Sequence, residues 1–341
     1  MLETAITAGA FPAAVVEVGR HDRVLWCGAF GTLTNDPSSV ETQSDTLFDL
    51  ASLTKVITTT TVTMVAVDRE LLGLTHRVAD WLPRWQGADR EGVTIGDLLA
   101  HASGLTSHMP FFRDCLGREE FEHGICTMPL EYQPRSMSLY SDLGFILLGF
   151  ILEDAFGQPL DTTFGALVDQ HAWGDLCFRP PATWKPRTAP TEIDPWRGRL
   201  LVGEVHDENS WALGKVAGHS GVFGTATAVG RFARTVLESF LAQPTLARSD
   251  TFRRFTTRTD IPKTSRALGW DMMRPTSSCG TLMSAQAIGH TGFTGTSIWI
   301  DPRSDTYIVF FTNRVHPTRT NDAILRIRPA LHDAVNRDLA R

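Results

Sequence analysis

The segment that decides the fold of this chain lies near its start and reads Phe48-Asp49-Leu50-Ala51-Ser52-Leu53-Thr54-Lys55. From Ser52 onward, apolar residues recur at helical spacing, at Val56, Ile57, Met64, Val67 and Leu71. This spacing predicts a helix that continues to Gly73, a residue type that often ends helices. The threonines at 58–61 oppose a helix because their β-branched side chains lose rotamer freedom there. We give the periodicity more weight and expect a helix from Ser52.

Ser52 and Lys55 stand three residues apart, so a helix places them on one face, one turn apart. The lysine amine can then reach the serine hydroxyl and assist its deprotonation. This S-x-x-K pattern occurs only here in the chain. The alternative is a helix-capping serine beside a solvated lysine. Ser52 is therefore the candidate nucleophile.

Lysine is rare in this protein. Of the 32 basic residues only four are lysines, at positions 55, 185, 215 and 263, and the other 28 are arginines. Arginine stays protonated at any working pH, whereas a lysine can be tuned to give up its proton. Lys55 is the only lysine three residues after a serine, which makes it the candidate partner of the nucleophile.

Composition excludes several classes of protein. The 341 residues are 42% hydrophobic, enough for one large or two ordinary domains. The net charge is −6 with no basic block, so no nucleic-acid partner is expected. The longest apolar run, 143–152, is too short to span a membrane. The first residues lack the character of a secretory signal, which predicts a cytoplasmic protein, the alternative being a periplasmic or secreted one whose signal has been removed.

The two ends of the chain carry strand patterns and its middle carries helical ones. Residues 14–30 predict a hairpin, and 296–300 and 306–312 predict a second one, followed by a helix over 319–341 with a kink at Pro329. Short helices are expected over 75–180, one of them opened by a Thr94–Asp97 capping box, and an irregular stretch over 179–199. We therefore expect one α/β (α+β) domain, residues 1–341. An antiparallel sheet from both chain ends, flanked by helices, forms one subdomain (1–75 plus 222–341), and a mostly helical insertion forms the other (76–221).

Three ordered motifs carry a resemblance to a known superfamily. Ser52-x-x-Lys55, Tyr140-Ser141-Asp142 and His290-Thr291-Gly292 resemble the motifs of the serine β-lactamases and penicillin-binding proteins. The nearest branch is that of the class C β-lactamase-related hydrolases and esterases. The resemblance extends through 98–105, 203–209 and 312–317 and covers about residues 5–335. It implies a β-lactamase/transpeptidase-like fold, a small-molecule ester, amide or β-lactam substrate, and neither metal nor cofactor.

The residues of the motifs suggest roles in acyl transfer. A nearby ammonium group favours a phenolate, so Tyr140 can act as general base for Ser52 and later protonate the leaving group. The resemblance implies that the backbone N–H groups of Ser52 and Phe293 form the oxyanion hole. It also implies that Asp142 and the motif residues His290, Thr291 and Gly292 contact the substrate.

Two positions depart from the motifs of the superfamily. Asp142 stands where asparagine is usual, so it can accept a hydrogen bond from Lys55 but cannot donate an amide hydrogen. His290 stands where a lysine helps to hold the substrate's carboxylate, and a neutral imidazole does this less well. An alternative alignment, Ser141-Asp142-Leu143 as the S-D-N motif, puts leucine where an amide is required, so we prefer the tyrosine alignment.

Other candidate sites are weaker. Ser220, in Gly218-His219-Ser220-Gly221-Val222, resembles a nucleophile elbow, but valine replaces the final glycine, and we expect His219 to pack beside the site. Residues 206–208, His-Asp-Glu, cluster like metal ligands without a second histidine at helical spacing, so a structural or cleft-lining role is expected. The tryptophans at 173, 184, 196 and 211 could form an apolar wall for the acyl group or belong to the ordinary core.

The favoured function is a serine hydrolase that forms an acyl-enzyme on Ser52 and hydrolyses a carboxylic ester or amide. One alternative is a DD-peptidase or β-lactamase acting on D-Ala-D-Ala peptides or β-lactams. The other is a non-catalytic module of the same fold that senses a ligand. The sequence does not set the oligomeric state.

Overall fold

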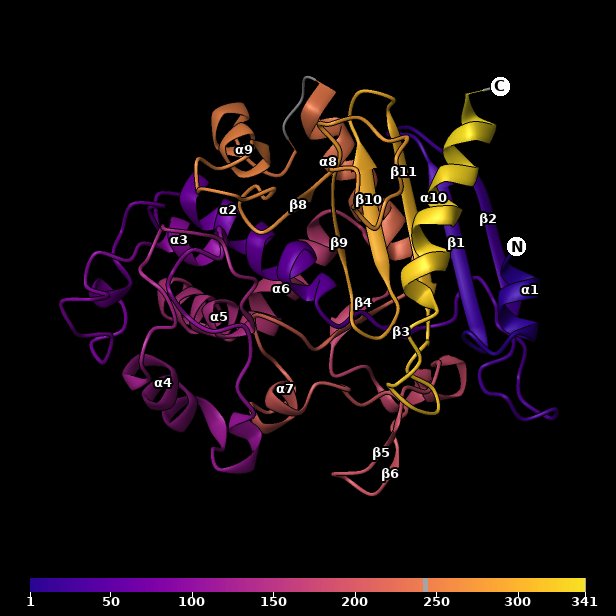
Figure 1. Ribbon diagram of the computed structural model, residues 1–341, viewed down its shortest axis with the longest axis horizontal. Helices are drawn as coiled ribbons and strands as arrows, with labels where there is room; N and C mark the ends of the chain where they lie inside the picture. The colour runs from indigo at the N-terminus through magenta and orange to yellow at the C-terminus, as the bar shows by residue number, and fades with distance from the viewer. Residues whose placement is uncertain (242–244, 341) are drawn as a thin grey trace.

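The fold is organised around one antiparallel sheet of six strands (Figure 1). We describe it from a computed structural model, which covers residues 1–241 and 245–340. The strand order is β2 (Val24–Gly31), β1 (Ala13–Gly19), β11 (Thr306–Thr312), β10 (Ser297–Asp301), β9 (Ile288–Thr291) and β8 (Asp271–Met272). The N-terminal β1 pairs with the C-terminal β11, from Ala14 opposite Thr312 to Gly19 opposite Tyr307. The prediction that both chain ends build one sheet is confirmed.

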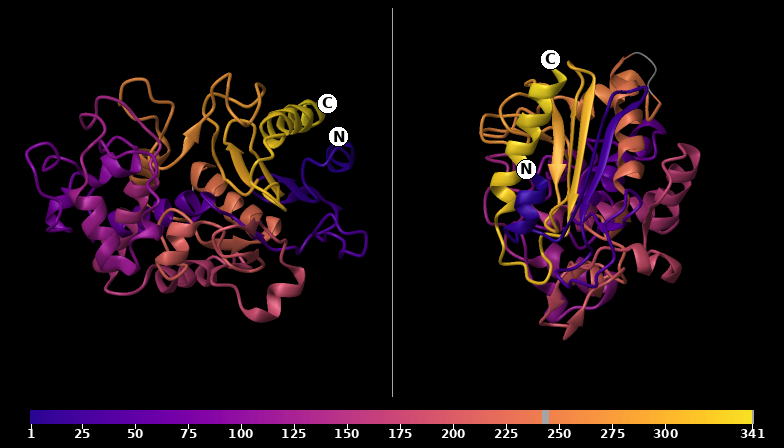
Figure 2. Two further views of the ribbon diagram at one scale, coloured as in Figure 1. Left: turned by 60° about the horizontal axis from the view of Figure 1, so that its bottom comes forward. Right: turned by 90° about the vertical axis from the view of Figure 1, so that its right-hand side faces the viewer.

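Helices cover both faces of this sheet (Figure 2). On one face, α1 (Leu2–Thr7) and α10 (Ile324–Leu339) pack against alternate strand residues such as Val16 and Phe310. On the other face, α8 (Ala226–Leu241) packs against Val15 and Phe311. Burial on both faces explains why every residue of β1 and β11 is buried. Helix α10 begins at Ile324 rather than at 319, and it includes Pro329.

The helix after Ser52 differs from the expected one. It opens with a π-helical segment, Lys55–Thr60, and continues as α2 (Thr61–Asp68). Threonine hydroxyls bond to carbonyl groups along this segment: Thr61 Oγ1 donates to Val56 O at 2.9 Å, and Thr59 Oγ1 donates to Gly218 O. The expected end at Gly73 is wrong. The helix ends at Asp68, because Glu70 already takes the left-handed conformation (φ 60°) that turns the chain away.

The middle of the chain forms the predicted short helices. Within the predicted range 75–180 they are α3 (Ile95–Leu99), α4 (Gly117–Thr127), α5 (Asp142–Phe156) and α6 (Leu160–Gln170), and α7 (Glu208–Ala212) and α9 (Ser249–Thr256) follow later. Short 3₁₀ turns lie at Val78–Asp80, Phe111–Arg113 and Ala182–Arg187. The Thr94–Asp97 capping box of α3 is confirmed.

Two small sheets complete the fold. One joins β3 (Phe48–Asp49), β7 (Val222–Gly224) and β4 (Leu176–Phe178), and the other pairs β5 (Ile193–Asp194) with β6 (Arg199–Leu200). The first of them links segments from both expected subdomains, and the subdomain boundaries stay a prediction. Among the described residues no single helix is long and apolar enough to cross a membrane; α5 and α6 reach that length only as a pair bent by 76°.

Candidate active site

Ser52 lies in the tight turn between β3 and the helix that follows. Leu50 N donates to Val222 O at 2.9 Å, which fixes the end of β3, and Lys55 N donates to Ser52 O at 3.1 Å as the helix begins. Ala51, between them, has the left-handed φ of 47°. An L-residue adopts this conformation only when its surroundings hold it there. The turn presents the Ser52 side chain to a cleft rather than to the core.

Lys55 is fully buried, with 0% of its side chain exposed. Its Nζ lies 2.7 Å from Asp142 Oδ1, 3.0 Å from Ser52 Oγ and 3.0 Å from the carbonyl oxygen of His219. Burial lowers the pKa of Lys55, but the charge of Asp142 and the phenol of Tyr140 outweigh burial, and the net pKa is raised. The resting site therefore contains an ammonium group in contact with the serine hydroxyl.

Asp142 is the first residue of α5 and the counter-ion of Lys55. Burial alone would raise its pKa, but Lys55 and the neighbouring His108 lower that pKa far below its ordinary value. The His108 Nδ1 atom lies 3.6 Å from Asp142 Oδ2. The position of Asp142 at the N-terminus of α5 further favours its ionised carboxylate. Asp142 thus holds the charge of Lys55 instead of offering an amide to the substrate.

Tyr140 lies two residues before the start of α5, with the centroid of its ring 4.9 Å from Lys55 Nζ. His101 positions it: Ser141 N donates to His101 Nδ1 at 3.0 Å, and the centroids of the His101 and Tyr140 rings lie 4.8 Å apart at an interplanar angle of 38°. Burial raises the pKa of Tyr140, and this effect exceeds the opposing effect of Lys55. Lys55 does favour the phenolate, as the sequence indicated, but desolvation outweighs this effect and the net pKa is raised. The role of Tyr140 as general base stays a prediction.

The third motif forms the end of β9 on the opposite wall. His290 is buried, and its Nδ1 lies 2.9 Å from Thr291 O, so Nδ1 carries the proton. Desolvation lowers the pKa of His290 to about 4. The imidazole is neutral at pH 7, in agreement with the expectation that it is a poor carboxylate anchor.

Gly292 and Phe293 follow in a turn that touches the segment before Ser52. A Cβ at Gly292 would lie 2.5 Å from Leu50 O, so only glycine allows this approach. Phe293 is 50% exposed in the cleft. Its ring stacks on His206 at 5.7 Å, and the Arg314 guanidinium lies 4.4 Å from it.

The cleft between these walls has a volume of about 590 Å³ and is lined by every site residue that the sequence indicated except Lys55, which is fully buried and contacts Ser52 Oγ. It is also lined by residues that sequence reasoning missed, namely His108, Arg266, Asp271, Arg314, Arg319 and Arg328. Arg314 lies in the quoted stretch 312–317, but no motif marked the other arginines. Ser220 lines the cleft, whereas none of the four tryptophans at 173, 184, 196 and 211 is among the described residues that do. Trp173 belongs to the core, which confirms the alternative of ordinary core packing at this position.

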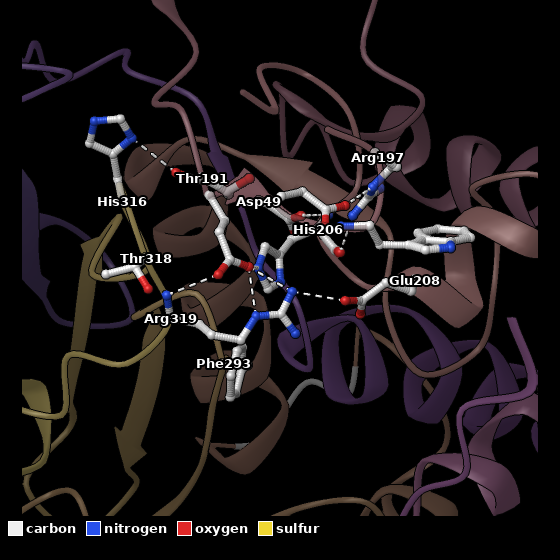
Figure 3. A network of polar contacts seen from close by, with 12 residues as sticks. Asp49, Thr191, Arg197, His206, Glu208, Phe293, His316, Thr318 and Arg319 are labelled. Atoms are coloured by element: carbon white, nitrogen blue, oxygen red, sulfur yellow. Dashed lines mark hydrogen bonds and ion pairs between the residues drawn. The ribbon is translucent and has the colours of Figure 1, made fainter. Parts of the chain in front are cut away.

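His206, Asp207 and Glu208 line the cleft, as expected, and each has a different partner. Figure 3 shows the contact between Glu208 and Arg319. His206 Nε2 lies 2.9 Å from Glu192 Oε2, and His219 Nε2 lies 2.8 Å from Asp207 Oδ1. Arg319 donates to both Glu192 and Glu208, at 2.6 and 2.8 Å. In the described part of the chain no group of three such side chains is arranged to hold a metal ion.

The fold, with the Ser52–Lys55–Tyr140 cluster in its main cleft, is that of a serine hydrolase with the β-lactamase/transpeptidase-like architecture. Residues 1–331 match the family described as Beta-lactamase, and the chain belongs to this family.

Three known proteins illustrate the relationship. The chain is 29% identical to a putative D-alanyl-D-alanine carboxypeptidase of Escherichia coli (strain K12), over 90% of this chain and 79% of that protein. The structure of EstCE1, a hydrolase with promiscuous acyltransferase activity, has the same fold with a TM-score of 0.75, 22% identity and 96% coverage of both chains. A class C β-lactamase from Rhodobacter sphaeroides matches with a TM-score of 0.77 and 19% identity, over 98% of this chain and 97% of that one.

The neutral His290 predicts a pH dependence of stability. Its pKa is lowered in the folded protein, so the unfolded chain binds this proton more readily, and stability falls as the pH drops from about 6.5 towards 4. The shift corresponds to roughly 3 kcal/mol lost over this window. His290→Gln should remove this part of the pH dependence of the free energy of unfolding. Urea unfolding between pH 4 and 7 measures it. An equal slope in the wild type and the variant would contradict the assignment.

Proposed function

We propose that Ser52 is the nucleophile of an acyl-transfer cycle in which an ester or amide acylates the serine and water releases the acyl group. The observation that carries this proposal is the buried ammonium of Lys55, 3.0 Å from Ser52 Oγ at the base of the cleft. Burial of a charged amine costs several kcal/mol unless it is paired. Here its partners are one carboxylate, one carbonyl and the hydroxyl that is to be activated, an arrangement suited to proton transfer.

The proton of Ser52 passes to the Lys55–Tyr140 pair. In the resting site Lys55 and Tyr140 are both protonated, because the pKa of each group is raised. The pair must therefore lose one proton before it can act as a base. Loss of one proton gives an amine with a phenol or an ammonium with a phenolate, and the apparent pKa belongs to the pair. That form accepts the proton as Oγ attacks the carbonyl carbon, and returns it to the leaving oxygen or nitrogen when the tetrahedral intermediate collapses.

The backbone N–H groups of Ser52 and Phe293 stabilise the negative oxygen of that intermediate. Both residues line the cleft. Neither N–H donates a hydrogen bond to another protein atom within residues 1–241 and 245–340. Two unused donors on either side of the nucleophile are what an oxyanion hole requires.

Ser52→Ala should abolish turnover, because no other group in the proposal can carry the acyl intermediate. We expect a loss of at least about a thousandfold in kcat/KM. The test uses short- and long-chain p-nitrophenyl esters, a D-Ala-D-Ala peptide and nitrocefin. Ser220→Ala, which removes a buried hydroxyl that also lines the cleft, should keep turnover within a few-fold. Activity that survives Ser52→Ala but not Ser220→Ala would contradict the assignment, and ligand binding without any turnover would support the sensing module instead.

A second candidate function, hydrolysis of substrates that carry a carboxylate, is favoured by Arg328. Arg328 is 4% exposed and lines the cleft, and its Nη2 donates to Thr296 O at 3.2 Å. Its buried Nε has no partner, and no carboxylate among the described residues forms an ion pair with it. Burial, assisted by the neighbouring charge of Arg314, lowers the pKa of Arg328 to about 10.

A buried guanidinium without a counter-ion favours an anionic ligand. Arg328 and Arg314 would then supply the positive charge that the neutral His290 lacks. D-Ala-D-Ala peptides and β-lactams both carry such a carboxylate, and the E. coli relative is named as a putative D-alanyl-D-alanine carboxypeptidase. A DD-peptidase or β-lactamase is therefore the second candidate.

Arg328→Met should weaken the preference for acidic substrates selectively. The measurement is the ratio of kcat/KM for p-nitrophenyl monosuccinate to that for p-nitrophenyl butyrate. Loss of one charge-assisted interaction should lower this ratio roughly 10- to 100-fold. Arg326→Met, on the exposed side of the same helix, is the matched control. Identical ratios for both variants would rule out this role of Arg328.

A further inference from the structure

We infer that Asp49 is a positioning residue that sets the geometry of both oxyanion donors at once. The inference rests on the proposed function, because it assigns a role to the Ser52 and Phe293 amides. Asp49 is the last residue of β3 and is 2% exposed. It forms no ion pair with a lysine or arginine in the described part of the chain. A buried carboxylate of this kind is costly unless its oxygens are fully used.

The first oxygen of the carboxylate controls the nucleophile turn. Asp49 Oδ1 accepts a hydrogen bond from Ala51 N at 2.8 Å. Ala51 is the residue with the left-handed φ of 47°, directly before Ser52. The contact holds a conformation that an L-residue otherwise avoids. Because the Ser52 N–H follows this residue, its direction depends on the bond to Asp49.

The second oxygen reaches the other donor through His206 (Figure 3). Asp49 Oδ2 accepts a hydrogen bond from His206 N at 2.7 Å. The imidazole of His206, held by Glu192, stacks on the Phe293 ring at an interplanar angle of 27°. On its carbonyl side Phe293 is fixed by Arg314, whose Nε donates to Phe293 O at 2.8 Å. The stack and this bond together restrict the Phe293 peptide.

The main chain of the same residue makes a third connection. Asp49 O accepts a hydrogen bond from Thr294 Oγ1 at 2.7 Å, and the next carbonyl, Leu50 O, accepts one from Thr296 Oγ1 at 3.1 Å. The turn that carries Phe293 is therefore bonded to the strand end that carries the nucleophile. Asp49 is the residue at which the Ser52 turn, the Phe293 turn and the His206 segment meet.

A carboxylate is needed at position 49 because two backbone N–H groups, those of Ala51 and His206, each donate to one of its oxygens. An asparagine offers one oxygen and one NH₂, so it can accept from Ala51 or from His206 but not from both. Neither donor is a side chain that could turn away. Asp49→Asn keeps the size of the side chain and breaks one of the two connections.

The test compares Asp49→Asn with Asp301→Asn. Asp301 is equally buried and its carboxylate also accepts two backbone N–H groups, from Ser284 at 2.7 Å and Arg303 at 3.0 Å, but it does not line the cleft. Misplaced oxyanion donors should lower kcat for a p-nitrophenyl ester about 10- to 100-fold, with KM within about threefold. The Ki of phenylboronic acid, whose tetrahedral adduct with Ser52 places an oxygen in the oxyanion hole, should rise by the same factor. Asp301→Asn should change neither quantity.

A second pair of variants keeps the inference testable if Asp49→Asn does not fold. His206→Ala removes the ring that stacks on Phe293 and should lower kcat, whereas His206→Phe should restore most of it. A kcat and a boronate Ki unchanged in Asp49→Asn, or a His206→Phe variant as slow as His206→Ala, would overturn the inference. Wild-type turnover that does not need Ser52 would instead overturn the proposed function, and the two failures are therefore distinguishable.

Discussion

The ion pair between Lys55 and Asp142 is the interaction on which the site depends. The ammonium is completely removed from solvent, and the carboxylate 2.7 Å away is its only anionic partner within ion-pair distance among the described residues. Removing one partner of such a pair strands the other charge at a cost of about 3–5 kcal/mol. The pair also ties the helix after Ser52 to the start of α5, which places Tyr140 and the nucleophile on one wall of the cleft.

The same electrostatics determine what the cleft can bind. Lys55 is neutralised by Asp142, and Arg319 is neutralised by Glu192 and Glu208. His290 is kept neutral by burial. Arg266 is paired with Asp271, so among the described residues that line the cleft the arginines without an ion pair are Arg328 and Arg314. We propose that acyl transfer uses Lys55 and that recognition of a substrate carboxylate uses Arg328 and Arg314.

The sequence predicted the parts of the structure that depend on local pattern. Alternating strands around short turns gave both hairpins, and the i, i+3 spacing of Ser52 and Lys55 gave their contact. The ionisation of Tyr140 could not be predicted, because it depends on burial by residues such as His101, distant in the chain. The bond from Thr59, in the π-helical segment, to Gly218 spans 159 residues, and the Asp49–His206 link spans 157. No spacing rule reports such long-range contacts.

The central claim is that Ser52, activated beside the buried ammonium, becomes covalently acylated. Its most direct test is the site of modification after exposure to a fluorophosphonate or a penicillin, determined by intact-protein mass and peptide mapping. The account predicts a single adduct on the peptide that contains Ser52, absent from the Ser52→Ala protein. An adduct of the same extent in Ser52→Ala, or one located on another residue such as Ser220, would contradict it.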